Sequence, residues 1–238
     1  MILHKKNCML CGKNKGFTLA EVLITLGIIG VVAAMTLPIL VGKYQKRVVA
    51  LKLKKTYSVL NNALKMSVAD NGDFETWGEE LYGSAANYVE KFWKPYINSI
   101  KTCNTRFECN YNNPKGSAIF NCRNSNGEER CAVYWFADKI SMLVLQDGIH
   151  IAFNSEIDDY HNTVTSKNIY VDINGAKGPN TIGKDAFIFK TMNNMVLPYG
   201  YNATKEAIQN DCSKDGYKKY CAAKIMQDGW QIKNDYPW

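Results

Sequence analysis

The sequence predicts an α+β protein, in which one long N-terminal helix is followed by an antiparallel sheet. Two observations predict this fold class. Residues 17–68 keep an apolar or helical spacing, and strand patterns begin only at Cys131. Because helix and strands occupy separate parts of the chain instead of alternating, we expect an antiparallel sheet with the helix packed on it.

The first part of this helix has the composition of a membrane span. Residues 17–41 number 25, and Glu21 carries the only formal charge among them. About 20 apolar residues cross a bilayer as a helix. A carboxylate in such a segment is costly without a partner, so Glu21 indicates more than anchoring. The alternative is a cleaved secretory signal ending near Ala33 and Ala34, but Glu21 and the length of the apolar run weigh against it.

The helix is expected to continue into the head. Three- and four-residue spacing extends from Val41 to Leu51, and a second apolar stripe follows at Leu53, Tyr57, Leu60, Leu64 and Val68. Pro38 predicts a kink, and Gly72 can end the helix in a left-handed conformation. We therefore expect a helix over residues 17–72, with its transmembrane part at 17–41, and a globular head over residues 73–238.

Within the head, residues 74–77 and 79–83 are expected to connect the long helix to a short one at 85–93. Residues 103–131 are rich in Asn, Gly and Cys and are expected to form a loop held by disulfides. Strands are expected at 131–136, 141–145, 149–153, 168–173 and 186–190, with Asp147 and Gly148 forming a hairpin turn. Another short helix is expected at 204–210.

The segment KGFTLAEVLITLGIIG at residues 15–30 resembles the prepilin leader of type IV pilins and type II secretion pseudopilins. The resemblance covers residues 12–42 and includes Pro38, the position of the helix-kinking proline of that family. It implies a leader at residues 1–16 and a prepilin peptidase that cuts between Gly16 and Phe17. The same enzyme would methylate the new N-terminus at Phe17, and Glu21 would become the fifth residue of the mature chain.

The resemblance also implies a function and partners. The protein would be a structural subunit of a type II secretion pseudopilus or a type IV pilus-like filament, assembled through its N-terminal helix with other subunits and an inner-membrane platform. There Glu21 would neutralise the Phe17 amine of a neighbour, so that each buried charge removes the cost of the other. The alternative is a membrane-anchored monomeric or tip binding protein: a minor pilin, an adhesin or a DNA-uptake receptor.

The family resemblance places the head outside the cytoplasm, on a single span in the inner membrane. Basic residues flank both ends of the span, so the positive-inside rule does not choose an orientation. The net charge of +7 lies mostly outside the head, because from Thr56 onward 19 Lys and Arg face 21 Asp and Glu, a balance of −2. A nucleic-acid-binding surface is therefore not expected.

The eight cysteines divide between leader and head. Cys8 and Cys11, with His4, make only an incomplete zinc site in the leader. An even number of cysteines in an exported head suits disulfides; these are Cys103, Cys109, Cys122, Cys131, Cys212 and Cys221. Cys212 and Cys221 flank a turn around Asp215 and are expected to pair, and the sequence leaves the other pairings open.

Residues 172–189 read DINGAKGPNTIGKDAFIF and carry candidate metal ligands at Asp172, Asn174 and Asp185. The segment is similar in place and composition to the calcium loop of major pseudopilins, which implies a candidate Ca²⁺ site. Calcium takes about six to eight oxygen ligands, and the spacing here is not that of an EF-hand. The alternative is a hairpin whose Asn-Gly and Gly-Pro-Asn turns need these residues for backbone geometry.

The chain ends in GWQIKNDYPW, similar to the endings of this prepilin-type group. Its aromatic residues are expected to pack on the sheet, with a partner-docking patch as the alternative. No enzymatic activity is expected, because the head cysteines can pair and the serines lie in no nucleophile motif. His150 lies in an alternating strand and is expected to face solvent.

Overall fold

The computed structural model describes residues 16–81, 85–111, 118–133, 140–154, 156–158, 163–166 and 168–238. The predicted leader up to Lys15, including His4, Cys8 and Cys11, lies outside these residues. The chain divides into two compact units, Met1–Gln45 and Lys46–Trp238.

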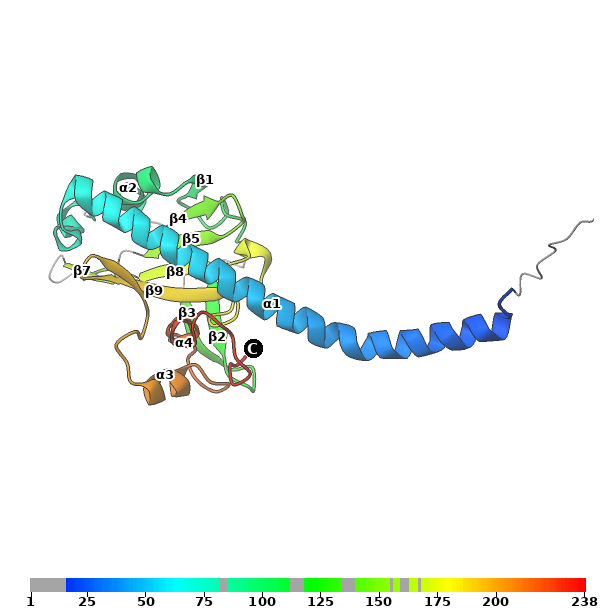
Figure 1. The fold of residues 1–238 in the computed structure, drawn as a ribbon. Helices are drawn as coiled ribbons and strands as arrows, with labels where there is room; N and C mark the ends of the chain where they lie inside the picture. Colours follow the sequence, from blue (N-terminus) through cyan, green and yellow to red (C-terminus); the bar gives the residue numbers. More distant parts are fainter. Residues whose placement is uncertain are drawn as a thin grey trace, which may run out of the picture. The chain divides into compact units, whose positions relative to one another are not determined.

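The elements follow the expected order of helix first and sheet afterwards (Figure 1). The helices are α1 Leu19–Asn71, α2 Ala85–Phe92, α3 Lys205–Asp211 and α4 Cys221–Gln227, with 3-10 helices η1 Phe74–Leu81, η2 Lys94–Tyr96 and η3 Gly175–Lys177. The strands are β1 Ser99–Cys103, β2 Phe120–Arg123, β3 Glu129–Val133, β4 Ile140–Leu145, β5 His150–Asn154, β6 Glu156–Asp158, β7 Thr163–Ser166, β8 Asn168–Asp172, β9 Ala186–Met192 and β10 Met195–Pro198. The α+β prediction is confirmed.

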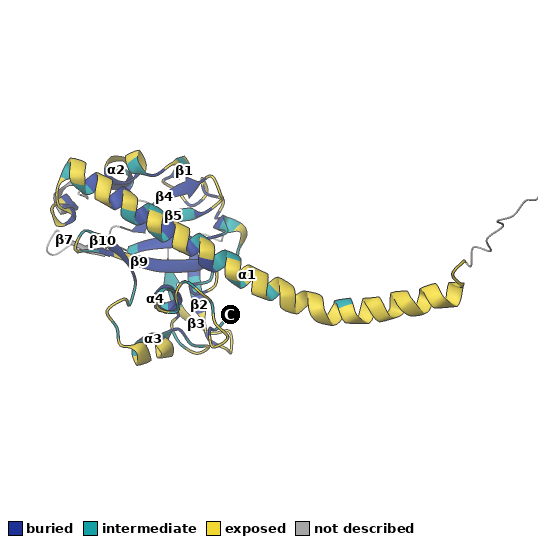
Figure 2. Ribbon diagram, viewed as in Figure 1, coloured by how far each residue is buried: buried dark blue, intermediate teal, exposed yellow. Residues whose placement is uncertain are grey.

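The main sheet of the described residues is antiparallel and has six strands in the order β1-β4-β5-β8-β9-β10. One face carries α1, whose stripe of Leu53, Leu60 and Leu64 is fully buried with inward residues of the strands such as Phe153 and Phe189. Figure 2 shows the buried side of α1 turned toward the sheet within the head. The predicted helical stripe is therefore the helix–sheet contact.

The opposite face of the sheet is covered as well. Met142, Ala152 and Tyr170 pack there in a second cluster, together with Tyr111 and Phe120 from segments that precede β4. Because β4 is covered on both sides, all six of its residues are buried. This explains why its sequence, ISMLVL, is almost continuously apolar.

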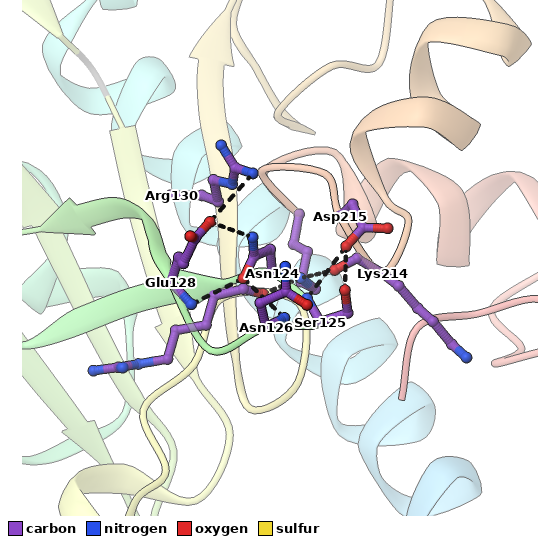
Figure 3. A network of polar contacts seen from close by, with 9 residues as sticks. Asn124, Ser125, Asn126, Glu128, Arg130, Lys214 and Asp215 are labelled. Carbon is purple, nitrogen blue, oxygen red and sulfur yellow. Dashed lines mark hydrogen bonds and ion pairs between the residues drawn. The ribbon is translucent and has the colours of Figure 1, made fainter.

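A polar network ties the turn between β2 and β3 to the loop between Cys212 and Cys221 (Figure 3). Asn124 Oδ1 accepts the backbone N–H of Asn126 at 3.0 Å and that of Glu128 at 2.8 Å, which closes the turn. Ser125 then donates from both its N–H and its hydroxyl to Asp215 Oδ1. The buried ammonium of Lys218 donates to the carbonyls of Arg123 and Lys214. These bonds hold two distant parts of the chain together.

The aromatic C-terminus packs on the head, as predicted. Tyr236 is buried and donates its hydroxyl to the carbonyl of Gly183. The ring of Trp230 lies 5.1 Å from that of Tyr57 in α1, so the contact is to the helix as well as to the core. The partly buried Trp238 also packs against this core.

Three sequence predictions are corrected. Residues 74–81 form the 3-10 helix η1 instead of a connecting loop, because Phe74 and Trp77 are buried and anchor it. Residues 103–131 are not one loop, since β2 and the start of β3 lie in this range and pair as a hairpin. The expected solvent exposure of His150 is wrong, because the segment ending at Tyr111 covers that face of the sheet.

Candidate functional site

The N-terminal part of α1 presents apolar side chains to its surroundings. Its large apolar residues are exposed, among them Leu19, Leu23, Ile29 and Leu40, and so is Phe17 just before the helix. In the part of the chain that the structure describes, one helix, α1, is long and apolar enough to cross a membrane. Exposing such a surface to water is unfavourable, so lipid or another apolar surface is expected to cover it.

Glu21 closes a capping box at the start of α1. Its carboxylate oxygen Oε2 accepts hydrogen bonds from the backbone N–H and the hydroxyl of Thr18, both at 2.8 Å. In return, the backbone N–H of Glu21 donates to Thr18 Oγ1 at 3.2 Å. The spacing Thr-x-x-Glu is the usual sequence signature of this arrangement. Glu21 therefore has a local structural function within one chain, which the sequence analysis did not identify.

Pro38 lies inside α1, so the helix continues through this proline. Its ring nitrogen has no hydrogen to donate to the carbonyl four residues earlier. The kink expected at this position stays a prediction.

A second site lies on the face of the sheet away from α1. The register of β5 and β8 places His150 opposite Asp172. The hydroxyl of Tyr111 donates to Asp172 Oδ2 at 2.7 Å and lies 3.2 Å from Nδ1 of His150. The three side chains thus form one chain of hydrogen bonds, with the tyrosine in the middle.

Burial sets the charges of this group. It raises the pKa of Asp172 to about 7, helped by the charge of Asp185 and opposed by the hydrogen bond from Tyr111. Burial, with a smaller contribution from Lys101, lowers the pKa of His150 to about 4. His150 is therefore neutral at neutral pH, whereas burial favours the protonated form of Asp172.

His150 also borders a pocket of about 400 Å³ between α1 and the turns at one end of the sheet. Lys52 reaches the pocket from α1, and Asp147 comes from the turn between β4 and β5. Asn174 and Lys177 border it from the segment that follows β8. Tyr111 lies over the face of the sheet that carries His150 because segments distant in the sequence contact each other. No local sequence pattern predicts this contact.

The three candidate calcium ligands have different environments. Both carboxylate oxygens of Asp185 accept backbone N–H groups, from Asn180 at 2.9 Å and Thr181 at 2.6 Å. Asp172 Oδ1 accepts the N–H of Asn174 at 3.2 Å. Asn174 borders the pocket, which neither aspartate lines. Hydrogen bonds from within the chain thus reach both carboxylate oxygens of each aspartate. Within the described ranges, no group of three or more His, Cys, Asp or Glu side chains could hold a metal ion.

The calcium hypothesis therefore stays a proposal with one clear test. If Ca²⁺ binds the folded loop, a chelator should lower the Tm of the detergent-solubilised protein and millimolar calcium should restore it. Free ligand at about a hundredfold excess over Kd would add about 2.7 kcal/mol to the free energy of unfolding. Magnesium should do less, because it demands tighter octahedral geometry. Equal melting curves in chelator and in calcium would show that the loop is only a turn.

Among the described residues the cysteines form three pairs: Cys103 with Cys109, Cys122 with Cys131, and Cys212 with Cys221. Each pair is close in sequence, and the expected partner of Cys212 is the one that the structure has. The second pair joins β2 to β3, and the third closes the loop that contains Asp215 and Lys218 of the polar network. Each bridge limits the freedom of the unfolded chain and thereby stabilises the folded head.

Comparison with known families assigns both parts of the chain. Residues 11–37 match the model of the prokaryotic N-terminal methylation motif, which is the prepilin signature of type IV pilins and pseudopilins. That motif implies processing by prepilin peptidase and assembly with other pilins. No curated protein and no solved structure matches the chain. Residues 39–238 match the model of a family of unknown function (DUF6613), and since this covers most of the sequence, the chain belongs to that family and is a pilin-like protein with a prepilin N-terminus.

Proposed function

We propose that this protein is a structural subunit of a helical filament, either a type II secretion pseudopilus or a type IV pilus-like fibre. The observation that carries the proposal is the N-terminal part of α1, which combines a prepilin motif with an exposed apolar surface. Before assembly, lipid would cover this surface. In the filament, the same surface of neighbouring subunits would cover it, and the head would face outward.

The contact would be heterologous, since the N-terminal amine of one subunit meets the carboxylate of another. A heterologous contact that does not close produces an open helical fibre. The amine is that of Phe17 after cleavage, and the carboxylate is that of Glu21. The heads of different subunits could then differ in sequence without changing this contact between their N-terminal helices.

Blocking the cleavage tests this proposal. Gly16→Val should leave the leader attached, because the substitution adds a branched side chain at the proposed cleavage site. The expected result is a longer precursor on gels and no head antigen on sheared surface fibres, as seen by immunogold electron microscopy. A matched change away from the junction, Gly27→Ala, should be processed normally. Unchanged mobility of Gly16→Val would contradict cleavage at this position, and abundant fibres made from uncut precursor would contradict the assembly mechanism.

A further inference from the structure

The part of α1 that follows the apolar run carries an unbalanced positive charge. Between Glu21 and Asp70 the sequence has seven lysine and arginine residues and neither aspartate nor glutamate. These cations are Lys43, Lys46, Arg47, Lys52, Lys54, Lys55 and Lys65. Like charges three or four residues apart on one helix repel each other and destabilise it. This stretch therefore favours anions supplied by groups outside the helix.

The head supplies partners for two of these cations. Lys55 pairs with Asp147 at 2.7 Å, and Lys52 donates to a backbone carbonyl of the head at 3.0 Å. The side chains of Lys46 and Arg47, in contrast, form no ion pair or hydrogen bond with any residue that the structure describes, and Arg47 is exposed. Both charges therefore remain for an external anion.

The C-terminal segment places an aromatic ring beside Lys46. The Nζ atom of Lys46 lies 5.9 Å from the centroid of the Trp238 ring, which is a cation–π distance. Trp238 is only partly buried, so the rest of the ring is accessible. Asp235, the acidic side chain of residues 229–238, already pairs with Lys224 at 2.6 Å. The side chains around Lys46 thus combine positive charge with an accessible indole.

The position of these residues along α1 brings them to the surface of the bilayer. At about 1.5 Å per residue, Arg47 follows the end of the apolar run at Val41 by about 9 Å along the helix axis. Lys54 follows it by about 20 Å and Lys65 by about 36 Å. Attraction between exposed charges falls off over a Debye length of about 8 Å at physiological ionic strength. The long side chains of Lys46 and Arg47 can therefore reach lipid phosphates, whereas the two later lysines lie too far away.

We propose that Lys46 and Arg47 bind the phosphates of anionic phospholipids, with the accessible part of Trp238 among the lipid head groups. Indole rings are enriched at this level of a bilayer. One basic residue near an anionic surface strengthens binding roughly fivefold, so the two together would favour the docked head roughly thirtyfold. The proposal rests on the membrane-anchored stage of the proposed function, and it names the lipid class that holds the head before assembly.

Quenching of tryptophan fluorescence tests this proposal on the full chain in vesicles. None of the five tryptophans lies within residues 17–41, so a nitroxide on the lipid head group reports contacts of the head. We expect stronger quenching in vesicles of equal parts phosphatidylglycerol and phosphatidylcholine than in phosphatidylcholine alone. Trp238→Phe should lose this difference. Equal quenching of the wild type in both kinds of vesicle would overturn the proposal.

Two further measurements separate this proposal from its alternatives. Flotation of the chain with both kinds of vesicle reports insertion of α1 by itself, so a failure of the membrane-anchored stage would be seen there and not mistaken for a failure of lipid recognition. Inorganic phosphate at constant ionic strength should leave the quenching unchanged, because a bilayer surface presents many phosphates at once. Loss of the difference in phosphate would assign a soluble anion to the site and would overturn the lipid assignment.

Variants locate the site. Lys46→Gln with Arg47→Gln should remove the difference between the two kinds of vesicle. The matched control, Lys54→Gln with Lys65→Gln, removes the same charge from exposed positions of α1 further along the helix and should behave as the wild type does. Equal losses in both double variants would mean that only net charge matters and would overturn the site.

A charge-preserving variant separates charge from packing. Lys46→Arg keeps the cation beside Trp238 and should dock as the wild type does. Loss of docking in Lys46→Arg would show that the packing of this side chain matters instead of its charge, which would contradict the proposal. If the double variant Lys46→Gln with Arg47→Gln misfolds, Arg47→Gln alone carries the test, because Arg47 is exposed. An unchanged difference between the vesicles in Arg47→Gln would then refute the proposed contact.

Discussion

Glu21→Ala is expected to leave the protein processed and membrane-bound but to abolish its fibres. In the proposed filament, Glu21 neutralises the Phe17 amine of a neighbour, and removing one partner leaves a buried charge unpaired. Such a loss typically costs about 3–5 kcal/mol, which per contact is enough to stop a growing fibre. The measurement is the amount of head antigen in sheared surface fibres, compared with the amount of mature protein in the membrane.

The capping box requires a control, because Glu21 also caps α1 through Thr18. Glu21→Gln keeps a side-chain oxygen for the cap but removes the charge. Thr18→Val removes the hydroxyl from the cap and leaves the charge. If charge pairing drives assembly, Glu21→Gln fails as Glu21→Ala does, while Thr18→Val still makes fibres. The reverse pattern would show that the cap, and not the charge, is what assembly needs.

The second prediction concerns the pH dependence of head stability. The pKa of Asp172 is raised from 3.8 to about 7, so the folded head binds this proton more tightly than the unfolded chain. The contribution of Asp172 to the free energy of unfolding is therefore full at low pH and is lost as the pH rises toward 7. The pKa of His150 is lowered from 6.5 to about 4, so its contribution is full above pH 6.5 and is lost as the pH falls. Between about pH 4 and 6.5 the two effects oppose each other.

Replacing one of the two residues at a time should reveal how the other changes the free energy of unfolding with pH. In His150→Gln, the free energy of unfolding should fall as the pH rises from 4 to 7, by up to about 1.4 kcal/mol per pH unit. In Asp172→Asn, stability should instead fall as the pH drops below 6.5. Urea unfolding of the compact unit Lys46–Trp238 across this range measures both. Glu206→Gln, at an exposed position of α3, serves as the control, and variant profiles parallel to that of the wild type would contradict the assigned shifts.

Several elements could be predicted because their signals are local. The apolar run, the stripe at Leu53 to Val68 and the stop near Gly72 depend on residues within a few turns of one another, and α1 ends at Asn71. Strands β4, β5, β8 and β9 carry apolar or alternating residues. Strand β1 was missed because its residues are mostly exposed or half-buried, and SIKTC has no clear alternation. Helix α4 was missed because its buried Cys221 and Lys224 do not form an apolar stripe.

The sequence by itself determined the prepilin motif, the membrane-compatible helix and the α+β class, because each depends on residues that are close together in the sequence. Only the tertiary structure decided that His150 is half-buried, that Tyr111 joins it to Asp172, and that Lys52 and Asn174 border one pocket. These relations depend on strand register and on a covering segment far away in the chain. Period-two alternation shows which residues share a face of a strand, but what covers that face is a matter of long-range packing.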